Sequence, residues 1–359
     1  MRHALKPHPW AVRRRSSGTL APMLKSDSLT AFRPVGIGCV VLSLALAACG
    51  GGGDEAESSD ENSRDSEAVT QVSPLTGLEA PDGLPQHPVM VVKIDNTSSA
   101  EPQVGLGDAE LVVEELVEGG STRLAAFFWT QTPGEVGPVR SMRSTDVGIV
   151  SPADGVLVAS GGAPPAKKDM KEAGIKTFTE GASAYSRDGD RVAPYNLMVD
   201  LEELAGKIGE AEPPGPYLPF GGADEFAGTK PANTVDVEFS AGHTTTWSFE
   251  KGTGWVREDD LAAQGDDLVP DTVLALEVKV GDAGYLDPAG NPVPESEFFG
   301  MGSGVVFHDG KALPCEWSKN GPDGSLELTT KGGQPVTVPA GHTWIELVPK
   351  RGGEVSYKG

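Results

Sequence analysis

Two arginines in the segment GPVRSMRSTD, Arg140 and Arg143, have the residue type and the spacing to bind an anion. If a short helix begins at Ser141, side chains three residues apart project from one side of its first turn. A helix N-terminus carrying two guanidinium groups is a suitable receptor for a carboxylate or a phosphate. The sequence therefore predicts an anion site around Arg140 and Arg143.

Polar residues near the ends of three apolar runs offer either further ligands or internal partners for these arginines. Asp95 and Asn96 end one run, Glu114 and Glu118 lie in the next, and Arg123 lies near the start of a third. Asp and Asn also end strands as turn formers, and arginine readily forms fork-like pairs with carboxylates. Two interpretations remain open, because the charges either form a ligand site or pair among themselves.

Other residue patterns that support catalysis or metal binding are weak in this sequence. The pair Ser248 and Lys251 in SFEK matches S-x-x-K, but that chemistry needs a helical turn and these residues lie in an alternating, strand-like segment. Zinc sites need several Cys or His ligands at close spacing. The cysteines are Cys39, Cys49 and Cys315, and the histidines after residue 48 are His87, His243, His308 and His342. We therefore predict no metal, no cofactor and no intrachain disulfide.

The elements that must position these side chains differ between the two halves of the chain. In the first half, apolar runs predict strands at 89–95, 111–118, 122–130 and 155–160, and Gly119, Gly120 and Ser121 predict a hairpin. Helices are predicted at 142–150, 164–173 and 201–208, with Asp200 as the N-cap of the last.

From Thr229 onward, short segments alternate apolar and polar residues between turn signals, which indicates a mostly antiparallel sheet with one buried face. The expected fold class is α+β, with a layered mixed sheet and short helices in the N-terminal half and mostly antiparallel β structure in the C-terminal half. We place the boundary near Gly228, which gives domains at 74–228 and 229–359.

The residues before these domains read as an export signal. The segment 35–48 has no charged residue, follows Lys25 and Arg33, and is shorter than the roughly 20 apolar residues of a membrane-spanning helix. Its end, LAAC, resembles the lipobox of bacterial lipoproteins. The resemblance implies that the sulfur of Cys49 receives diacylglycerol and that cleavage follows Ala48, so 1–48 would be the signal peptide. A plain secretory signal is the alternative, and Met23 is a possible true start.

Residues 49–73 are rich in glycine and acidic side chains, which predicts a disordered tether. The formal net charge of the whole chain is -23. Such an acidic surface repels nucleic-acid phosphate and anionic lipid headgroups, so we expect no nucleic-acid partner. The expected membrane contact is the lipid on Cys49, and an envelope protein or wall polymer remains a possible partner.

Several motifs occur together in an order that resembles the YerB-like lipoproteins, a family of unknown function with N- and C-terminal parts. They are PLTG, VKIDN, PQVGL, ELVVEELVEGGSTR, VGPVRSMRSTD, GSGVVFHDG, WSKNG and VPAGHTWIELVP. The resemblance implies a layered α+β architecture and an extracytoplasmic lipoprotein anchored on the cell membrane, but no reaction. Tyr195 stands where the family is expected to have a histidine, which puts a catalytic role there in doubt.

Three functions are compatible with these features. The first is a membrane-tethered binding or scaffold module of the cell envelope with an anion site, which needs only an anchor, a tether and a folded head. The second is an envelope polymer hydrolase that uses Asp95 with Glu114 or Glu118 as its acid and base. The third is the solute-binding lipoprotein of an importer, although such proteins have two similar α/β lobes. We favour the binding module, without enzymatic activity.

Overall fold

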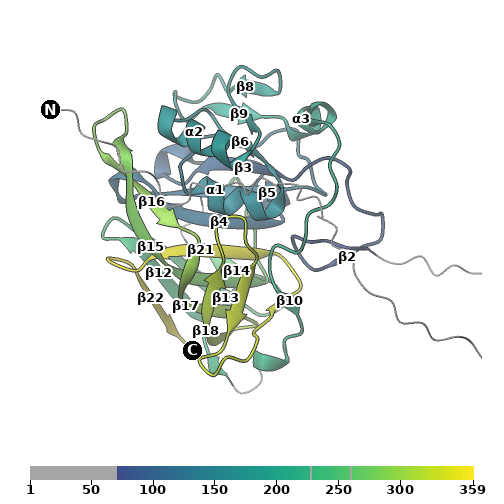
Figure 1. Ribbon diagram of the computed structural model, residues 1–359, viewed down its shortest axis with the longest axis vertical. Helices are drawn as coiled ribbons and strands as arrows, with labels where there is room; N and C mark the ends of the chain where they lie inside the picture. The colour runs from purple at the N-terminus through teal and green to yellow at the C-terminus, as the bar shows by residue number, and fades with distance from the viewer. Residues whose placement is uncertain (1–70, 227–228, 259–260) are drawn as a thin grey trace, which may run out of the picture. The chain divides into compact units, whose positions relative to one another are not determined.

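The computed structural model describes residues 71–226, 229–258 and 261–359, which belong to one compact unit (Figure 1). The predicted signal peptide, Cys49 and the predicted tether up to residue 70 lie outside the described residues. The last tether residues belong to a strand pair instead, because β1 (Gln71–Val72) pairs antiparallel with β2 (Glu79–Ala80).

One large mixed sheet runs through both halves of the described chain. Its strand order is β11 (Lys230–Pro231), β18 (Lys311–Lys319), β17 (Gly300–His308), β15 (Thr272–Leu286), β21 (Thr343–Pro349), β4 (Leu111–Leu116), β5 (Thr122–Phe128), β3 (Met90–Asp95), β6 (Val156–Val158) and β7 (Thr177–Phe178). Two more strands join at the side, where β16 (Pro292–Glu297) pairs with β15 and β19 (Leu326–Thr329) pairs with β18.

Strand β21 joins the two halves of this sheet. It lies between β15 and β4 and runs parallel to both, so that Thr343 is in register with Thr272 on one side and with Leu111 on the other. All seven residues of β21 are buried, as expected for a central strand covered on both faces. Strands from the N-terminal half and the C-terminal half therefore share one hydrogen-bonded sheet.

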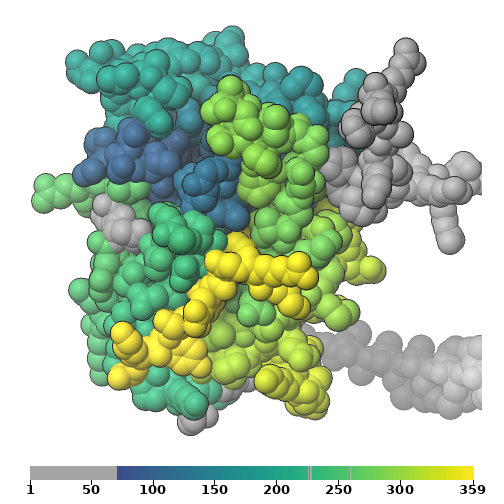
Figure 2. Space-filling model, turned by 90° about the vertical axis from the view of Figure 1, so that its left-hand side faces the viewer, coloured from purple at the N-terminus to yellow at the C-terminus, as the bar shows by residue number. Residues whose placement is uncertain are grey.

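A second, four-stranded antiparallel sheet comes from the C-terminal half. It has the order β14 (Gly254–Arg257), β13 (His243–Glu250), β12 (Thr234–Ser240) and β22 (Glu354–Lys358). Strand β12 alternates half-buried and buried residues, which is the predicted pattern of a sheet with one buried face. The last residues of the chain lie across the surface in yellow in Figure 2 and pair with β12.

Helices and short strand pairs complete the fold. The helices are α1 (Asp146–Val150), α2 (Pro164–Ala173) and α3 (Leu201–Ile208), and short 3-10 turns lie at Ser98–Ala100, Leu106–Asp108, Glu118–Gly120, Ser151–Ala153 and Asp224–Phe226. Strand β8 (Tyr185–Arg187) pairs antiparallel with β9 (Leu197–Val199), and β10 (Phe220–Gly221) pairs parallel with β20 (Val338–Pro339). The predicted α+β fold class is confirmed.

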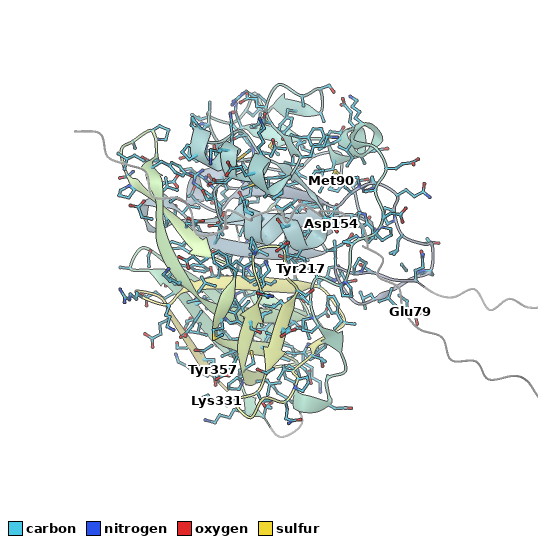
Figure 3. The ribbon with its side chains drawn as sticks, viewed as in Figure 1. Glu79, Met90, Asp154, Tyr217, Lys331 and Tyr357 are labelled. Atoms are coloured by element: carbon cyan, nitrogen blue, oxygen red, sulfur yellow. The ribbon has the colours of Figure 1, made fainter. Side chains whose placement is uncertain are left out.

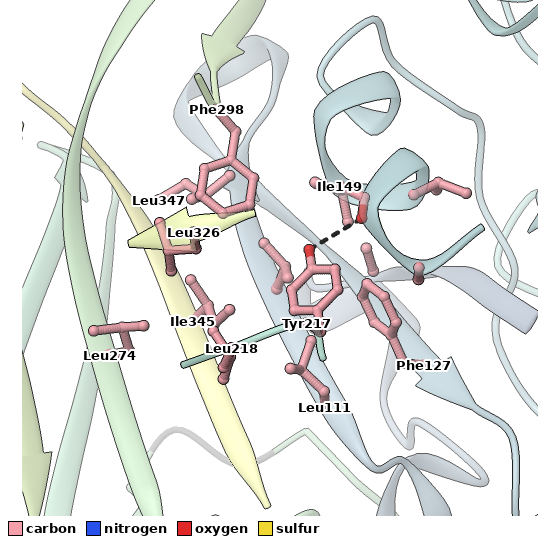
Figure 4. Packing of buried hydrophobic residues seen from close by; sticks show 14 of the residues in the cluster. Leu111, Phe127, Ile149, Tyr217, Leu218, Leu274, Phe298, Leu326, Ile345 and Leu347 are labelled. Atoms are coloured by element: carbon pink, nitrogen blue, oxygen red, sulfur yellow. Dashed lines mark hydrogen bonds between the residues drawn. The ribbon is translucent and has the colours of Figure 1, made fainter. Parts of the chain in front are cut away.

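Two apolar cores lie on the two faces of the large sheet. Residues at odd positions of β4, such as Leu111 and Val113, belong to one core, whereas Val112 belongs to the other. Figure 4 shows the first core, where the hydroxyl of Tyr217 donates a hydrogen bond of 3.0 Å to the backbone oxygen of Ile149. This alternation assigns every residue of β3, β4 and β5 to one face or the other.

Most of the predicted elements in the first half are confirmed, and one helix begins later than predicted. Helices α2 and α3 have the predicted bounds, and the side chain of Asp200 accepts a hydrogen bond from the backbone N–H of Glu203 as an N-cap. The hairpin between β4 and β5 turns at Gly119 and Gly120, which both have positive φ, a conformation that suits glycine.

The predicted helix at 142–150 is four residues too long at its start, and Ser141 does not cap it. Helix α1 begins at Asp146, and its N-cap residue Thr145 makes no side-chain capping bond. The preceding backbone is taken up by the sheet instead, because Arg140 N–H donates to the oxygen of Lys93 and Asp95 N–H donates to the oxygen of Pro138. Pairing with the end of β3 therefore prevails over local helix signals.

Candidate functional site

The predicted site residues gather where β3 and β4 end and β5 begins, but they divide between the two faces of the sheet. Side chains at odd-numbered positions, such as Asp95 and Arg123, lie on the face that α1 covers. Side chains at even-numbered positions, such as Asn96 and Glu114, lie on the opposite face. Glu118, just beyond β4, contacts the arginines. The sequence placed these residues near one another but did not separate the faces.

On the α1 face, two of the three arginines pair with Glu118. Arg143 forms a bidentate pair with this carboxylate, and the Nε hydrogen bond is 2.9 Å long. Arg123 Nη2 lies 3.4 Å from the same carboxylate, and its Nη1 donates to the backbone oxygen of Ser141 at 2.9 Å. Both arginine side chains are 7% exposed. These two guanidinium groups are thus buried ion-pair partners.

Burial and neighbouring charges shift the acidity of this group. Burial, and after it the charge of Arg143, lowers the pKa of Arg123 to about 10. Burial opposes the ionisation of Glu118, but its hydrogen bond and charge interaction with Arg143 outweigh this and lower its pKa. Glu118 is therefore an ionised acceptor at neutral pH.

Arg140 differs from the other two arginines because it reaches the surface. Its side chain is 20% exposed, and its Nε lies 2.7 Å from Oδ2 of Asp95. The guanidinium carbon lies 5.1 Å from the ring centroid of Tyr195, a cation–π contact. Asp95 is fixed from the other side, because its Oδ1 accepts hydrogen bonds from the N–H and the hydroxyl of Thr97. Arg140 is thus held by a carboxylate and an aromatic ring at an accessible edge.

A buried ion triad beneath these arginines was missed by the sequence analysis. Lys93 Nζ lies 2.6 Å from Glu115 Oε1 and 2.8 Å from Asp146 Oδ1, and all three side chains are 0% exposed. Burial raises the pKa of Glu115, partly offset by Lys93. A charged residue inside an apolar run, as in VMVVKID and LVVEEL, is the sequence signal that could have revealed the triad.

On the opposite face, Glu114 is the centre of a buried polar network. Its side chain is 0% exposed and its Oε1 lies 2.9 Å from His243 Nε2 of β13, 3.1 Å from the hydroxyl of Thr245 and 3.1 Å from Nδ2 of Asn96. Burial opposes the ionisation of Glu114, but the hydrogen bond and charge of His243 outweigh it and lower the pKa. This network connects the large sheet to the four-stranded sheet.

Asn96 continues the network towards β14. Its Oδ1 accepts hydrogen bonds from Gln103 at 3.1 Å and from Arg257 Nη1 at 3.2 Å. The guanidinium group of Arg257 also lies 4.9 Å from the ring centroid of Trp344 in β21. Asn96 is therefore an internal bridge between strands. The predicted acid–base pair of Asp95 and Glu114 is divided by the sheet itself, and Glu114 does not open to solvent.

Within the described ranges, no three His, Cys, Asp or Glu side chains come together as metal ligands. Cys315 is free and buried on β18, where burial raises the pKa of its thiol to about 12. Among residues 71–226, 229–258 and 261–359, no helix combines the length and the apolar character needed to cross a bilayer.

The fold and the motifs of this site belong to a family that has been defined in two parts. The family described as "Protein of unknown function (DUF3048) N-terminal domain" matches residues 75–213, and its C-terminal domain matches residues 235–345. The chain therefore belongs to this family, and the predicted boundary near Gly228 falls between the two matched segments.

A relative from Bacillus subtilis agrees with this assignment in both sequence and structure. A protein of Bacillus subtilis (strain 168) named "Putative lipoprotein YerB" is 28% identical over 297 residues, which cover 77% of this chain and 86% of the relative. The crystal structure of the YerB protein from Bacillus subtilis matches 80% of this chain and 99% of its own with a TM-score of 0.66, at 22% identity. The resemblance to the YerB-like family is confirmed, and the shared fold extends over both halves.

Proposed function

We propose that this protein is a lipid-anchored binding module on the outer side of the cytoplasmic membrane, and that Arg140 is its contact for an anionic group. The anchor is the sulfur of Cys49, in the segment that resembles a lipobox. The relative described as a lipoprotein supports this placement. An acidic spacer then holds the folded head near the membrane, where a high effective concentration makes weak contacts useful.

The observation that carries the binding role is the position of Arg140. Among the described residues, none accepts a hydrogen bond from Nη1 or Nη2 of Arg140. The corresponding nitrogens of Arg123 and Arg143 donate hydrogen bonds to Glu118 and to backbone oxygens. The Tyr195 ring and Asp95 hold the guanidinium plane in place before a ligand arrives. A planar, preorganised guanidinium group suits a carboxylate or a phosphate on an envelope protein or wall polymer.

The alternatives receive less support from the geometry. A hydrolase would need a pair of carboxylates in an open cleft. Asp95 and Glu114 lie on opposite faces and Glu114 is fully buried. In the other predicted pair, Asp95 and Glu118 are each ion-paired with an arginine. An importer protein would have two similar lobes, but here one sheet runs through both halves. No specific contact in the described residues favours either function.

The binding role is tested with an Arg140→Gln variant and Arg187→Gln as the matched control. Arg187 is another partly exposed arginine with a carboxylate partner, Glu180. The lipidated full chain is crosslinked in its native membrane, and captured proteins and wall fragments are compared among the variants. We expect Arg140→Gln alone to lose partners. An unchanged set in that variant, with cooperative melting retained, rejects Arg140 as the contact.

The anchor is tested separately by intact-mass analysis of protein from its native host. We expect a chain that begins at Cys49 and carries the added mass of a lipid. A chain that retains residues before Cys49, or that has an unmodified thiol there, contradicts the anchoring proposal without affecting the folded head.

A further inference from the structure

A cavity of about 400 Å³ lies at the other end of β4 from the arginines. Its walls come from the hairpin of β1 and β2 and the loop after it, from the residue before β4, from residues just after β5 and from the residue before β21. Its polar lining includes Glu79, Asp82, Glu110, Thr130 and His342. A volume of this size fits a small organic ligand, since ligand sites commonly measure roughly 300–1,000 Å³.

One wall residue, Glu110, has a buried carboxylate of which only one oxygen accepts hydrogen bonds. The residue is 3% exposed. Its Oε1 accepts hydrogen bonds from the N–H of Trp129 at 3.2 Å, the N–H of Thr130 at 2.5 Å and the hydroxyl of Thr130 at 2.7 Å. Its Oε2 is buried and has no hydrogen-bond partner among the described residues. A buried acceptor without a donor is costly, so a donor at this position gains free energy.

The charge of the cavity indicates what kind of donor fits. Its walls carry the carboxylates of Glu110, Glu79 and Asp82 and contain no lysine or arginine. Glu79, on β2, is labelled in Figure 3. The one histidine of the wall, His342, is itself near a carboxylate, with Nδ1 at 3.8 Å from Asp271 Oδ2. A cationic donor is therefore favoured over a neutral or an anionic one.

The remaining walls select an organic cation over a metal ion. Leu78, Ala80, Pro81 and Pro85 present apolar surface beside the carboxylates. Calcium would need six to eight oxygen ligands, and no group of three potential ligand side chains occurs within the described residues. A primary ammonium group needs few acceptors, and the hydrocarbon stem that bears it can lie on the proline and leucine side chains.

We propose that this cavity binds a primary ammonium group on a short aliphatic stem, such as a lysine or diamino-acid side chain presents, with Glu110 as the counter-ion. The ammonium group supplies the donor that Oε2 lacks, and Glu79 and Asp82 add long-range attraction. This site is independent of the proposed anion contact, because Glu110 precedes β4 and Arg140 lies beyond its other end, next to the end of β3.

The test measures the binding of 1-pentylamine to the purified full chain by titration calorimetry and ligand-observed NMR at neutral pH. 1-Pentanol is the neutral probe of the same shape, and calcium chloride is the metal probe. We expect saturable binding of the amine and at least about tenfold weaker binding of the alcohol, because the alcohol lacks the charge-assisted hydrogen bond. Equal binding of amine and alcohol, binding of calcium but not of the amine, or no saturable amine binding overturns the proposal.

Variants locate the site. Glu110→Gln keeps an oxygen to accept from Thr130 but removes the charge, and we expect it to weaken amine binding at least about tenfold. Glu354→Gln, an exposed carboxylate on β22, is the matched control and should bind the amine like the wild type. Unchanged affinity in a folded Glu110→Gln variant overturns the assignment.

A second pair of variants serves if Glu110→Gln does not fold. Leu78 is 42% exposed, so its substitution leaves the core intact. Leu78→Arg adds a competing cation to the wall and should abolish amine binding, whereas Leu78→Gln should retain it. Equal amine affinity in these two variants also overturns the proposal.

Discussion

Lys93 provides the sharpest test of how the arginine site is supported. Its ammonium group lies between Glu115 of β4 and Asp146 of α1, at 2.6 and 2.8 Å, with all three side chains fully buried. Lys93→Met keeps the apolar stem but leaves two carboxylates without their cation. The loss therefore acts on the contact between the sheet and the segment that carries Arg140 and Arg143.

The size of the effect follows from the burial of the triad. Removing one partner of a buried ion pair costs about 3–5 kcal/mol, because the remaining charge stays buried. Asp146 retains a hydrogen bond of 2.7 Å from the N–H of Arg143, so its charge is partly compensated. We therefore expect a loss of about 4 kcal/mol in the free energy of unfolding, which corresponds to a fall in Tm of roughly 10 °C for a domain of this size.

Urea unfolding of the wild type, Lys93→Met, Glu115→Met and the double variant Lys93→Met/Glu115→Met measures this loss. We expect the double variant to be more stable than the sum of its single changes by about 1–3 kcal/mol, because it removes one of the two uncompensated charges. Lys167→Met, at an exposed position of α2, is the control and should change stability by less than about 0.5 kcal/mol. A Lys93→Met variant within about 1 kcal/mol of the wild type refutes the triad as a stabilising contact.

Three further changes test other parts of the structure. His243→Ala removes the partner of Glu114, whose pKa in the folded protein is lowered from 4.5. The stability that this ionised carboxylate contributes above pH 4.5 is lost as the pH falls through its folded-state pKa. Acid unfolding, followed by circular dichroism, should therefore begin at a higher pH in the variant than in the wild type. Burial lowers the pKa of Lys319 to about 7, so the folded state releases a proton before the unfolded state does. Wild-type stability relative to Lys319→Met should therefore be constant below pH 7 and rise by up to about 1.4 kcal/mol per pH unit from pH 7 to pH 10.5, and a falling difference would contradict the assignment. Asp200→Ala removes the N-cap bond of α3 and should cost about 1 kcal/mol in thermal unfolding, whereas Asp200→Asn should cost less.

Local patterns were sufficient to predict the elements whose residues alternate or repeat within a few positions. Helices α2 and α3 have the predicted bounds, and β12 has the alternation predicted for the C-terminal half, since an initial proline, a capping aspartate and alternation are local signals. Strand β16 lacks such a signal, because PVPESE carries prolines and charges that resemble a loop, although it pairs with the long strand β15.

The candidate site was predictable in its location but not in its pairing. The sequence placed Asp95 and Arg123 near the ends of neighbouring strands and Arg140 at the start of a predicted helix, and the ion pairs between arginines and carboxylates were one of the two expected outcomes. The roles of Glu118 and His243 depend on which strand lies beside which, and on contacts between residues far apart in the chain. Such contacts leave no short-range pattern in one sequence.

Glu110 and Lys93 were not singled out for a related reason. Each stands beside or within an apolar run, where a single charged residue is readily taken for the solvent-facing position of a half-buried strand. Their burial results from coverage of both faces of the sheet, which the alternation within one strand does not reveal.

The position of β21 in the large sheet limits the order in which its strands can pair. During synthesis from the N-terminus, one edge of β4 stays unpaired until the segment Thr343–Pro349, near the other end of the chain, has been made. Such long-range closure is slow and leaves an apolar edge open to wrong partners. A chain that ends before Thr343 would thus leave the N-terminal half incompletely folded as well, so the two halves complete their folding together.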